Sequence, residues 1–137
     1  MVVSEYRIQK TEEEWREQLD PVQYRVLREK GTERPFTHEL WKESPKGTYL
    51  CAACETPLFK DTAKFFSACG WPAFYEAAEA GTVKEIEDFT HGMHRVEVVC
   101  AACGGHLGHV FQDAPHTPTG LRYCINGVSL KFVPPAE

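Results

Sequence analysis

Six cysteines dominate the chemistry that this chain of 137 residues could perform. Four of them form two pairs with two residues between the members, and the other two stand alone. The short spacing lets both thiolates of a pair turn inward on a tight knuckle, and two knuckles fill all four positions of a tetrahedral site, the structural arrangement for zinc. We therefore predict one structural Zn²⁺ per chain, with the ligands Cys51, Cys54, Cys100 and Cys103.

A redox-active Cys-x-x-Cys motif and simple disulfides are the alternatives for these pairs. Two matched pairs in one chain favour zinc over both alternatives. The 45 residues between Cys54 and Cys100 are more than a compact zinc finger contains. The metal is therefore expected to join two hairpins that lie far apart in the sequence.

Cys124, an unpaired cysteine, lies in the segment Arg-Tyr-Cys-Ile-Asn. Residues two apart on a β-strand share a face, so Arg122, Cys124 and Asn126 would point the same way. The arginine favours the nucleophilic thiolate form of the cysteine. The alternative is a buried cysteine that acts as a small hydrophobic residue.

The same alternation continues into apolar positions after Asn126, which raises a question about the strand. Either Gly127 forms a bulge that resets the alternation, or one face runs from the core into a polar cleft. The sequence leaves both explanations open for Val128, Leu130 and Phe132.

Two histidines near the second cysteine pair form another candidate group. On a regular strand His106 and His109 would point to opposite sides, but Gly108 can redirect the chain so that both rings reach one pocket. Histidine titrates near neutral pH, which suits a general acid, and Asp113 could orient one ring. The alternative is that they are zinc ligands or surface histidines. Four thiolates already fill the metal site, but either histidine could have a purely structural role.

Cys69, the other unpaired cysteine, begins the turn Cys-Gly-Trp-Pro. Trp71 precedes a proline, which restricts its backbone and would fix the indole as the wall of a pocket. Ordinary core packing is an equally good interpretation of Trp71.

The elements that position these residues change character near residue 32. A capping box at Thr11 and Glu14 predicts a short helix, and Asp20-Pro21 predicts the start of a second one that stops at Lys30-Gly31. We therefore expect residues 1–31 to form a helical arm.

Beyond this arm, apolar residues alternate with period two, as in strands. Helices followed by strands favour an α+β or all-β fold over a doubly wound sheet. We expect a single domain over residues 1–137, with a mainly β catalytic core over residues 32–137. Strands are predicted at Thr48–Cys51, His94–Cys100 and Val128–Phe132.

The net charge of −5 does not favour nucleic acid or an anionic membrane as a partner. The first residues lack the apolar stretch of a signal peptide, and no apolar run has the length of a transmembrane helix. We therefore expect a cytoplasmic protein whose thiols stay reduced.

Together these motifs resemble the peptide methionine-R-sulfoxide reductases of the MsrB type, from about Arg34 to Phe132. The mild departures are Ala68, where a glycine is usual, and Gly127-Val128, where Ser-Ala often follows the asparagine. The resemblance also includes Met93, Arg95 and Glu97, and its main motifs are Cys51-x-x-Cys54, Cys69-Gly-Trp-Pro, Cys100-x-x-Cys103-Gly-Gly-His-Leu-Gly-His-Val-Phe and Pro118-Thr-Gly-Leu-Arg-Tyr-Cys-Ile-Asn126.

The resemblance implies two antiparallel sheets, with zinc opposite the active site. It implies that Cys124 attacks the sulfur of methionine-R-sulfoxide in proteins and peptides, while His109, with His106 beside it, protonates the departing oxygen. Cys124 would become a sulfenic acid, Cys69 would form a disulfide with it, and thioredoxin would reduce that disulfide.

The resemblance also suggests roles for three further residues. Asn126 would help to hold the substrate, Arg122 would favour the thiolate, and Trp71 would receive the methyl group of the sulfoxide.

Two other functions remain open on the residues alone. A thiol, an imidazole and an asparagine also make a cysteine hydrolase, although such an enzyme has no use for Cys69. The other is a zinc-knuckle binding module without catalysis, against which the unpaired cysteines and the acidic charge argue.

Overall fold

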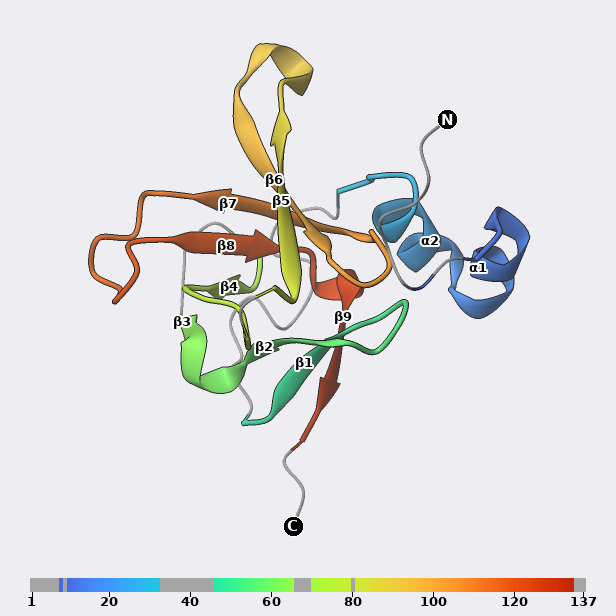
Figure 1. Ribbon diagram of the computed structural model, residues 1–137, viewed down its shortest axis with the longest axis horizontal. Helices are drawn as coiled ribbons and strands as arrows, with labels where there is room; N and C mark the ends of the chain where they lie inside the picture. The colour runs from blue at the N-terminus through green and yellow to red at the C-terminus, as the bar shows by residue number, and fades with distance from the viewer. Residues whose placement is uncertain (1–7, 9, 33–45, 66–69, 80, 135–137) are drawn as a thin grey trace.

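The computed structural model describes residues 8, 10–32, 46–65, 70–79 and 81–134. Within them, two short helices precede nine strands, which form two antiparallel sheets (Figure 1). This confirms the predicted fold class, a mainly β fold of two antiparallel sheets with a short N-terminal helical arm. The elements are α1 (Glu12–Gln18), α2 (Pro21–Leu27), β1 (Thr48–Cys51), β2 (Pro57–Lys60), β3 (Lys64–Phe65), β4 (Ala73–Phe74), β5 (Val83–Asp88), β6 (Arg95–Cys100), β7 (His106–Phe111), β8 (Arg122–Ile125) and β9 (Leu130–Val133).

Both helices begin where the capping signals predict. The Thr11 hydroxyl accepts a hydrogen bond from the Glu14 amide, and the Glu14 carboxylate accepts one from the Thr11 amide. Asp20 and Gln23 repeat this reciprocal arrangement at the start of α2. Helix α2 ends at Leu27, before the predicted stop at Lys30-Gly31.

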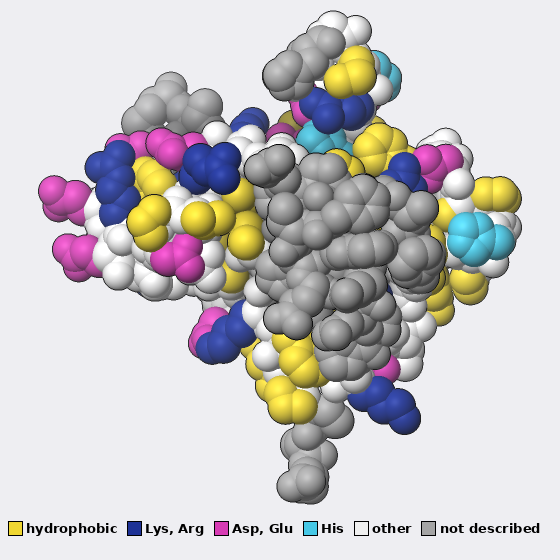
Figure 2. All heavy atoms as spheres, turned by 180° about the vertical axis from the view of Figure 1, so that it is seen from behind, with side chains coloured by type: hydrophobic (Ala, Val, Ile, Leu, Met, Phe, Trp, Pro, Cys, Tyr) yellow, Lys and Arg dark blue, Asp and Glu magenta, His cyan; other side chains and the backbone are white. Residues whose placement is uncertain are grey.

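The helical arm packs on the β core through a few large side chains. Trp15 and Leu27 are almost fully buried and belong to the same hydrophobic cluster as the residues between the sheets. The exposed side of the arm mixes acidic and basic side chains, as the left of Figure 2 shows. In the described part of the chain no helix has the length and apolar character needed to span a membrane.

The larger sheet has the strand order β3-β4-β8-β7-β6-β5, and the smaller one has the order β2-β1-β9. One face of the larger sheet packs on the smaller sheet through aromatic rings. Phe59 of β2 stacks on Phe74 of β4 with 4.4 Å between ring centroids, and Tyr49 of β1 meets Phe74 edge-on at 5.2 Å. Since strand residues alternate between faces, the polar residues of β6, β7 and β8 lie on the opposite face.

The structure explains why the alternating positions after Asn126 are apolar. A 3₁₀ turn over Gly127–Ser129 separates β8 from β9, and the two strands belong to different sheets. Gly127 therefore begins a turn rather than a bulge, and the predicted strand Val128–Phe132 starts only at Leu130. The strand predicted from His94 likewise begins one residue later.

A register shift in β7 brings the two histidines to one face. Glu97 pairs with His109 and Val98 with Gly108, but Val99 pairs with His106, so Leu107 is an extra residue. An extra residue reverses the alternation beyond it, which places His106 on the same face as His109. The predicted convergence of the rings is confirmed, although the bulge lies at Leu107 and not at Gly108.

Gly108 has a different structural role, because β7 and β8 approach closely at this position. A Cβ atom added to Gly108 would lie 1.9 Å from the carbonyl oxygen of Cys124, a backbone atom that cannot move aside alone. Glycine is therefore required by the contact between the strands.

We predict that Gly108→Ala lowers the free energy of unfolding by about 3 kcal/mol, the upper end of the usual cost of overpacking. Gly81→Ala is the matched control, since its added Cβ would contact nothing within 4 Å and only the positive φ of +87° opposes it, a cost of about 1 kcal/mol. Urea unfolding of both variants measures the difference. Equal losses would contradict the close contact.

Candidate active site and metal centre

The four paired cysteines converge where the two sheets meet. Their sulfur atoms all lie within 4.8 Å of one another. The Sγ atoms of Cys51 and Cys103 are 3.8 Å apart, and those of Cys54 and Cys100 are 3.6 Å apart. A tetrahedral site with Zn–S bonds of about 2.3 Å requires S–S separations of about 3.8 Å. The cluster therefore fits a four-coordinate metal ion.

Both cysteine pairs lie on turns of the same form. The amide that follows each pair donates to the carbonyl of its first cysteine, from Glu55 to Cys51 and from Gly104 to Cys100, both at 2.8 Å. These two donors have φ values of 64° and 77°, which close the turns tightly. One turn follows β1 of the smaller sheet and the other follows β6 of the larger sheet. A metal here would join the two sheets, as expected from the sequence.

The helical arm contacts both turns of the metal cluster. The Gln18 side chain donates a hydrogen bond to the carbonyl oxygen of Ala53. The Arg28 guanidinium donates to the carbonyl oxygen of Cys103 at 3.0 Å, and the Ile8 amide donates to that of Ala102 at 2.9 Å. The arm therefore holds the cluster from outside the β core.

We predict that chelation of the metal, or Cys103→Ser, lowers the free energy of unfolding by several kcal/mol, because metal binding at a structural site is folding free energy. Cys124→Ser is the control, since this cysteine is outside the cluster, and it should retain one metal ion per chain. Metal analysis and urea unfolding test both proteins. Unchanged stability of the metal-free protein would refute a structural role.

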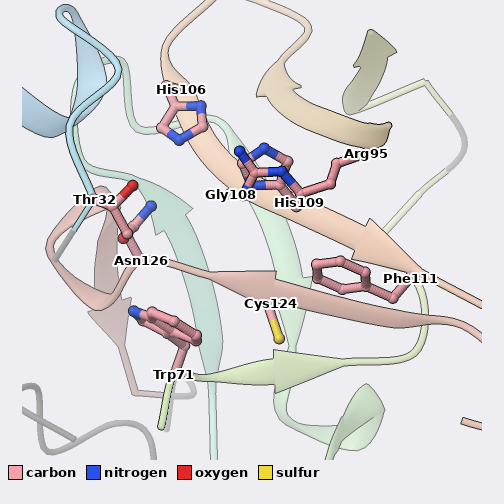
Figure 3. Close-up of a pocket in the computed structure, with 9 residues that line it drawn as sticks. All are labelled: Thr32, Trp71, Arg95, His106, Gly108, His109, Phe111, Cys124 and Asn126. Atoms are coloured by element: carbon pink, nitrogen blue, oxygen red, sulfur yellow. The ribbon is translucent and has the colours of Figure 1, made fainter. Parts of the chain in front are cut away.

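On the polar face of the larger sheet lies a pocket with a cavity volume of about 90 Å³ (Figure 3). Five of the predicted site residues line it. Arg122 contacts the sulfur of Cys124 and so adjoins the pocket, whereas Cys69 lies outside the described residues. The lining residues are Trp71, His106, His109, Cys124 and Asn126, together with Thr32, Arg95, Gly108 and Phe111, whose part in the pocket the sequence did not indicate.

Cys124 is buried at the centre of β8, between Ala73 of β4 and His109 of β7. The Arg122 guanidinium donates to its Sγ atom, as the shared strand face predicts. Asp113 orients this guanidinium through two hydrogen bonds of 2.8 and 2.7 Å. A cation beside the sulfur favours the thiolate.

The prediction that Asp113 orients a histidine is wrong, because its carboxylate is bound to Arg122. This hydrogen bond holds the pKa of Asp113 below its ordinary value. Each imidazole has a different carboxylate partner, one on β6 and one at the end of β5.

His106 is paired with Glu97, and both side chains are buried. Its Nδ1 atom lies 2.7 Å from a carboxylate oxygen, and the Lys30 ammonium is 3.4 Å from the other oxygen. Burial acts to raise the pKa of Glu97, but the hydrogen bond with His106 and the charge of Lys30 outweigh it, so that pKa is lowered. An ionised Glu97 fixes the proton on Nδ1 and leaves Nε2 for the pocket.

His109 is paired with Asp88 through its Nε2 atom, at 2.8 Å. The amide and hydroxyl of Thr90 also donate to this carboxylate, and Arg95 forms an ion pair with it at 3.5 Å. The hydrogen bonds from His109 and Thr90 hold the pKa of Asp88 well below its usual range. Burial lowers the pKa of His109, although the bond to Asp88 opposes this shift.

The remaining pocket residues complete the walls. Trp71 is half-buried and lines the pocket, which agrees with the wall interpretation. The Asn126 side chain is buried and donates to the carbonyl oxygen of Leu107 at 2.9 Å, so it also ties the bulge of β7 to the end of β8. The ring centroids of His106 and His109 are 5.7 Å apart.

The sequence patterns predicted neither Asp88 as a partner of His109 nor Glu97 as a partner of His106. A signal for Glu97 was available, because Arg95 and Glu97 are charged residues two apart on one face of an otherwise apolar strand. Asp88 gave no such signal, since its side chain reaches His109 only through the pairing of β5, β6 and β7.

We predict that His109 titrates below the ordinary histidine pKa of about 6.5, and that Asp88→Asn lowers this pKa further because it removes the partner that favours the imidazolium. Two-dimensional NMR of the imidazole as a function of pH measures the midpoint. Glu87→Gln is the matched control, since this carboxylate is bonded to His94 instead. A rise of the midpoint in Asp88→Asn would contradict the pairing.

Comparison with known proteins shows the family of the chain. A family model described as "SelR domain" matches residues 19–134. The chain is 57% identical over 128 residues to a peptide methionine sulfoxide reductase MsrB from Agrobacterium fabrum, a match that covers 93% of this chain and 94% of that protein. Proteins of the same name from Leptospira interrogans and Thiobacillus denitrificans are 54% and 58% identical over 93% and 91% of this chain, and 96% and 94% of their own lengths. The resemblance found in the sequence is thus confirmed, and the chain belongs to the SelR domain family, that of the peptide methionine sulfoxide reductases MsrB.

Proposed function

We propose that this protein reduces the R epimer of methionine sulfoxide in proteins and peptides to methionine. The observation that carries the proposal is the pocket in which the Cys124 sulfur, contacted by a guanidinium, lies beside two imidazoles that each have a carboxylate partner. Membership of the MsrB family supports the same reaction.

In the first step the Cys124 thiolate attacks the sulfur of the sulfoxide. Arg122 stabilises the thiolate before attack. The half-buried indole of Trp71 receives the methyl group, and Asn126 helps to hold the substrate. The attacking sulfur of Cys124 and the indole of Trp71 thus contact different parts of the substrate, its sulfur and its methyl group, which gives a physical basis for preference between the epimers.

The departing oxygen requires a proton, which His109 provides with His106 beside it. With Nε2 bonded to Asp88, Nδ1 is the nitrogen that passes the proton to the substrate. The lowered pKa of His109 makes its imidazolium a stronger acid than an exposed histidine. One sulfoxide, one thiolate and one proton give methionine and a sulfenic acid on Cys124.

In the second step the Cys69 thiol condenses with this sulfenic acid, which releases water and forms a disulfide. Thioredoxin then reduces the disulfide by exchange. Cys69 is assigned from the sequence motif, because it lies outside the described residues. The balance of the cycle is one sulfoxide and two external thiols in, and one thioether, one disulfide and one water out.

The metal has no part in these steps. We propose Zn²⁺ as the ion, because four thiolates are its usual structural ligands and leave no position for substrate.

We also propose that residues 1–137 act as one catalytic domain, which the shared hydrophobic cluster supports. Thiol ligands and thioredoxin recycling both suit the reducing cytoplasm.

The function is tested with the separate R and S epimers of a methionine sulfoxide peptide and dithiothreitol as reductant. We expect turnover of the R epimer only, and no turnover by Cys124→Ser. The lost activity reflects the missing nucleophile, because serine is not acidified by the same environment. Equal turnover of both epimers would overturn the proposal.

The matched variant Cys69→Ser separates the two cysteines in the same experiment. It should still form about one methionine per enzyme without reductant, yet fail to cycle with thioredoxin. Loss of the first turnover as well would contradict the resolving role of Cys69. Hydrolysis of an acyl substrate that depends on Cys124 would instead support the cysteine hydrolase.

A further inference from the structure

We propose that Lys30 is a positioning residue that directs the proton of the reaction to His109 rather than to His106. It acts through Glu97, because its ammonium balances the negative charge that would otherwise draw a proton onto His106. This inference rests on the proposed function, in which His109 is the acid. It gives the helical arm a part in the chemistry of the pocket.

The two histidines compete for a proton because their surroundings are similar. Each ring is hydrogen-bonded to a carboxylate, His106 to Glu97 at 2.7 Å and His109 to Asp88 at 2.8 Å. The ring centroids are 5.7 Å apart, so a positive charge on one ring opposes a positive charge on the other. The charges around each carboxylate therefore decide which ring carries the proton.

Glu97 is the more deeply buried of the two carboxylates. Its side chain is 4% exposed, whereas that of Asp88 is 14% exposed. Asp88 also accepts hydrogen bonds from the amide and hydroxyl of Thr90 and forms an ion pair with Arg95. A buried carboxylate next to an imidazole favours the charged imidazolium. Without a further cation, Glu97 would therefore place the proton on His106.

Lys30 supplies this cation from the helical arm. Its Nζ atom lies 3.4 Å from the carboxylate oxygen of Glu97 that does not bind His106. The Lys30 side chain is 71% exposed, so its ammonium brings a charge to the buried carboxylate while it stays in water itself. This arrangement avoids most of the desolvation cost of a buried ion pair. With Lys30 in place, Glu97 stays ionised and the proton of His106 stays on Nδ1.

The backbone at Lys30 is an independent indication that this position matters. Its φ of 56° lies in the left-handed region, where glycine is the usual residue just after a helix. The Gly31 amide closes the turn by donating to the carbonyl oxygen of Arg25 at 2.8 Å. Thr32 then lines the pocket together with His106 (Figure 3). A glycine would fit this turn with less strain, whereas the lysine brings a cation to Glu97.

The other cations around the two rings have different contacts. The Arg28 guanidinium donates to a carbonyl of the metal cluster, and the Arg122 guanidinium contacts the nucleophile. In the described part of the chain, Lys30 is the residue whose ammonium or guanidinium forms an ion pair with Glu97. Besides Lys30 and Glu97, the titratable and charged groups around the rings are Arg28 of the arm, Asp88 of β5, Arg95 of β6, and Arg122 and Cys124 of β8.

The test varies the charge and the backbone at position 30 in the full chain. Lys30→Met removes the charge, Lys30→Arg keeps it, and Lys30→Gly removes it together with the strain of the positive φ. Lys131→Met is the matched control, because Lys131 is paired with the exposed Glu55 on the smaller sheet's side of the molecule. Two-dimensional NMR of the imidazoles follows both titrations, and kcat/KM for the R sulfoxide peptide is measured over the same pH range.

In Lys30→Met and Lys30→Gly we expect the Glu97–His106 pair to take up a proton at a pH about 0.5 to 1 unit higher than in wild-type protein, as for the loss of one partly screened charge. The midpoint of His109 should fall, because a charge on His106 opposes its protonation. The decline of kcat/KM with rising pH should then begin at a lower pH. Lys30→Arg and Lys131→Met should keep the wild-type midpoints.

An unchanged titration of the pair in Lys30→Met, or an equal shift in Lys30→Arg, would overturn the proposal. A rise at the pair without a fall at His109 would overturn the directing role as well. A merely structural role of Lys30 would lower kcat/KM equally at every pH and leave both midpoints in place. Failure of the proposed function gives a different result, since the wild-type protein would then reduce no sulfoxide, whereas the titrations do not depend on activity.

Discussion

The antiparallel pairing of β7 with β8 is the contact on which the rest of the pocket depends. It places His109 directly across from Cys124, and it requires a glycine at position 108 because the two backbones touch there. The bulge at Leu107 then turns His106 to the same face. A thiol and two imidazoles thus gather on the polar face of the sheet, while the aromatic residues of the opposite face form the core.

The carboxylates of the described part of the pocket are bound to imidazoles or to a guanidinium. Glu97 and Asp88 each bind one histidine, and Asp113 binds the arginine that contacts the cysteine. Burial of an unpaired charge costs several kcal/mol, so these pairs are a condition for placing the residues under the surface at all. The same pairs fix the tautomers of the histidines and the direction of the guanidinium. The pairs that allow these side chains to be buried are therefore the same pairs that orient them for the chemistry.

The metal centre supports the pocket from a distance. Its two turns follow β1 and β6, so a bound ion ties the smaller sheet to the strand that carries Arg95 and Glu97. The helical arm closes over these turns and also brings Lys30 to Glu97. The arm carries no reactive group of its own, yet it contacts both the metal cluster and the charged edge of the pocket.

The local chemistry of this protein could be predicted from short stretches of sequence. Paired cysteines, capping boxes and the shared face of Arg122 and Cys124 depend on neighbours a few residues apart, and the structure has all of them. The partners of charged groups were not predictable in this way. Asp113 is four residues from His109 and yet binds Arg122, whereas Asp88 is 21 residues away and binds His109. Strand order, register and the bulge at Leu107 decide which side chains meet across a sheet, and these result from the packing of the whole chain rather than from any one segment.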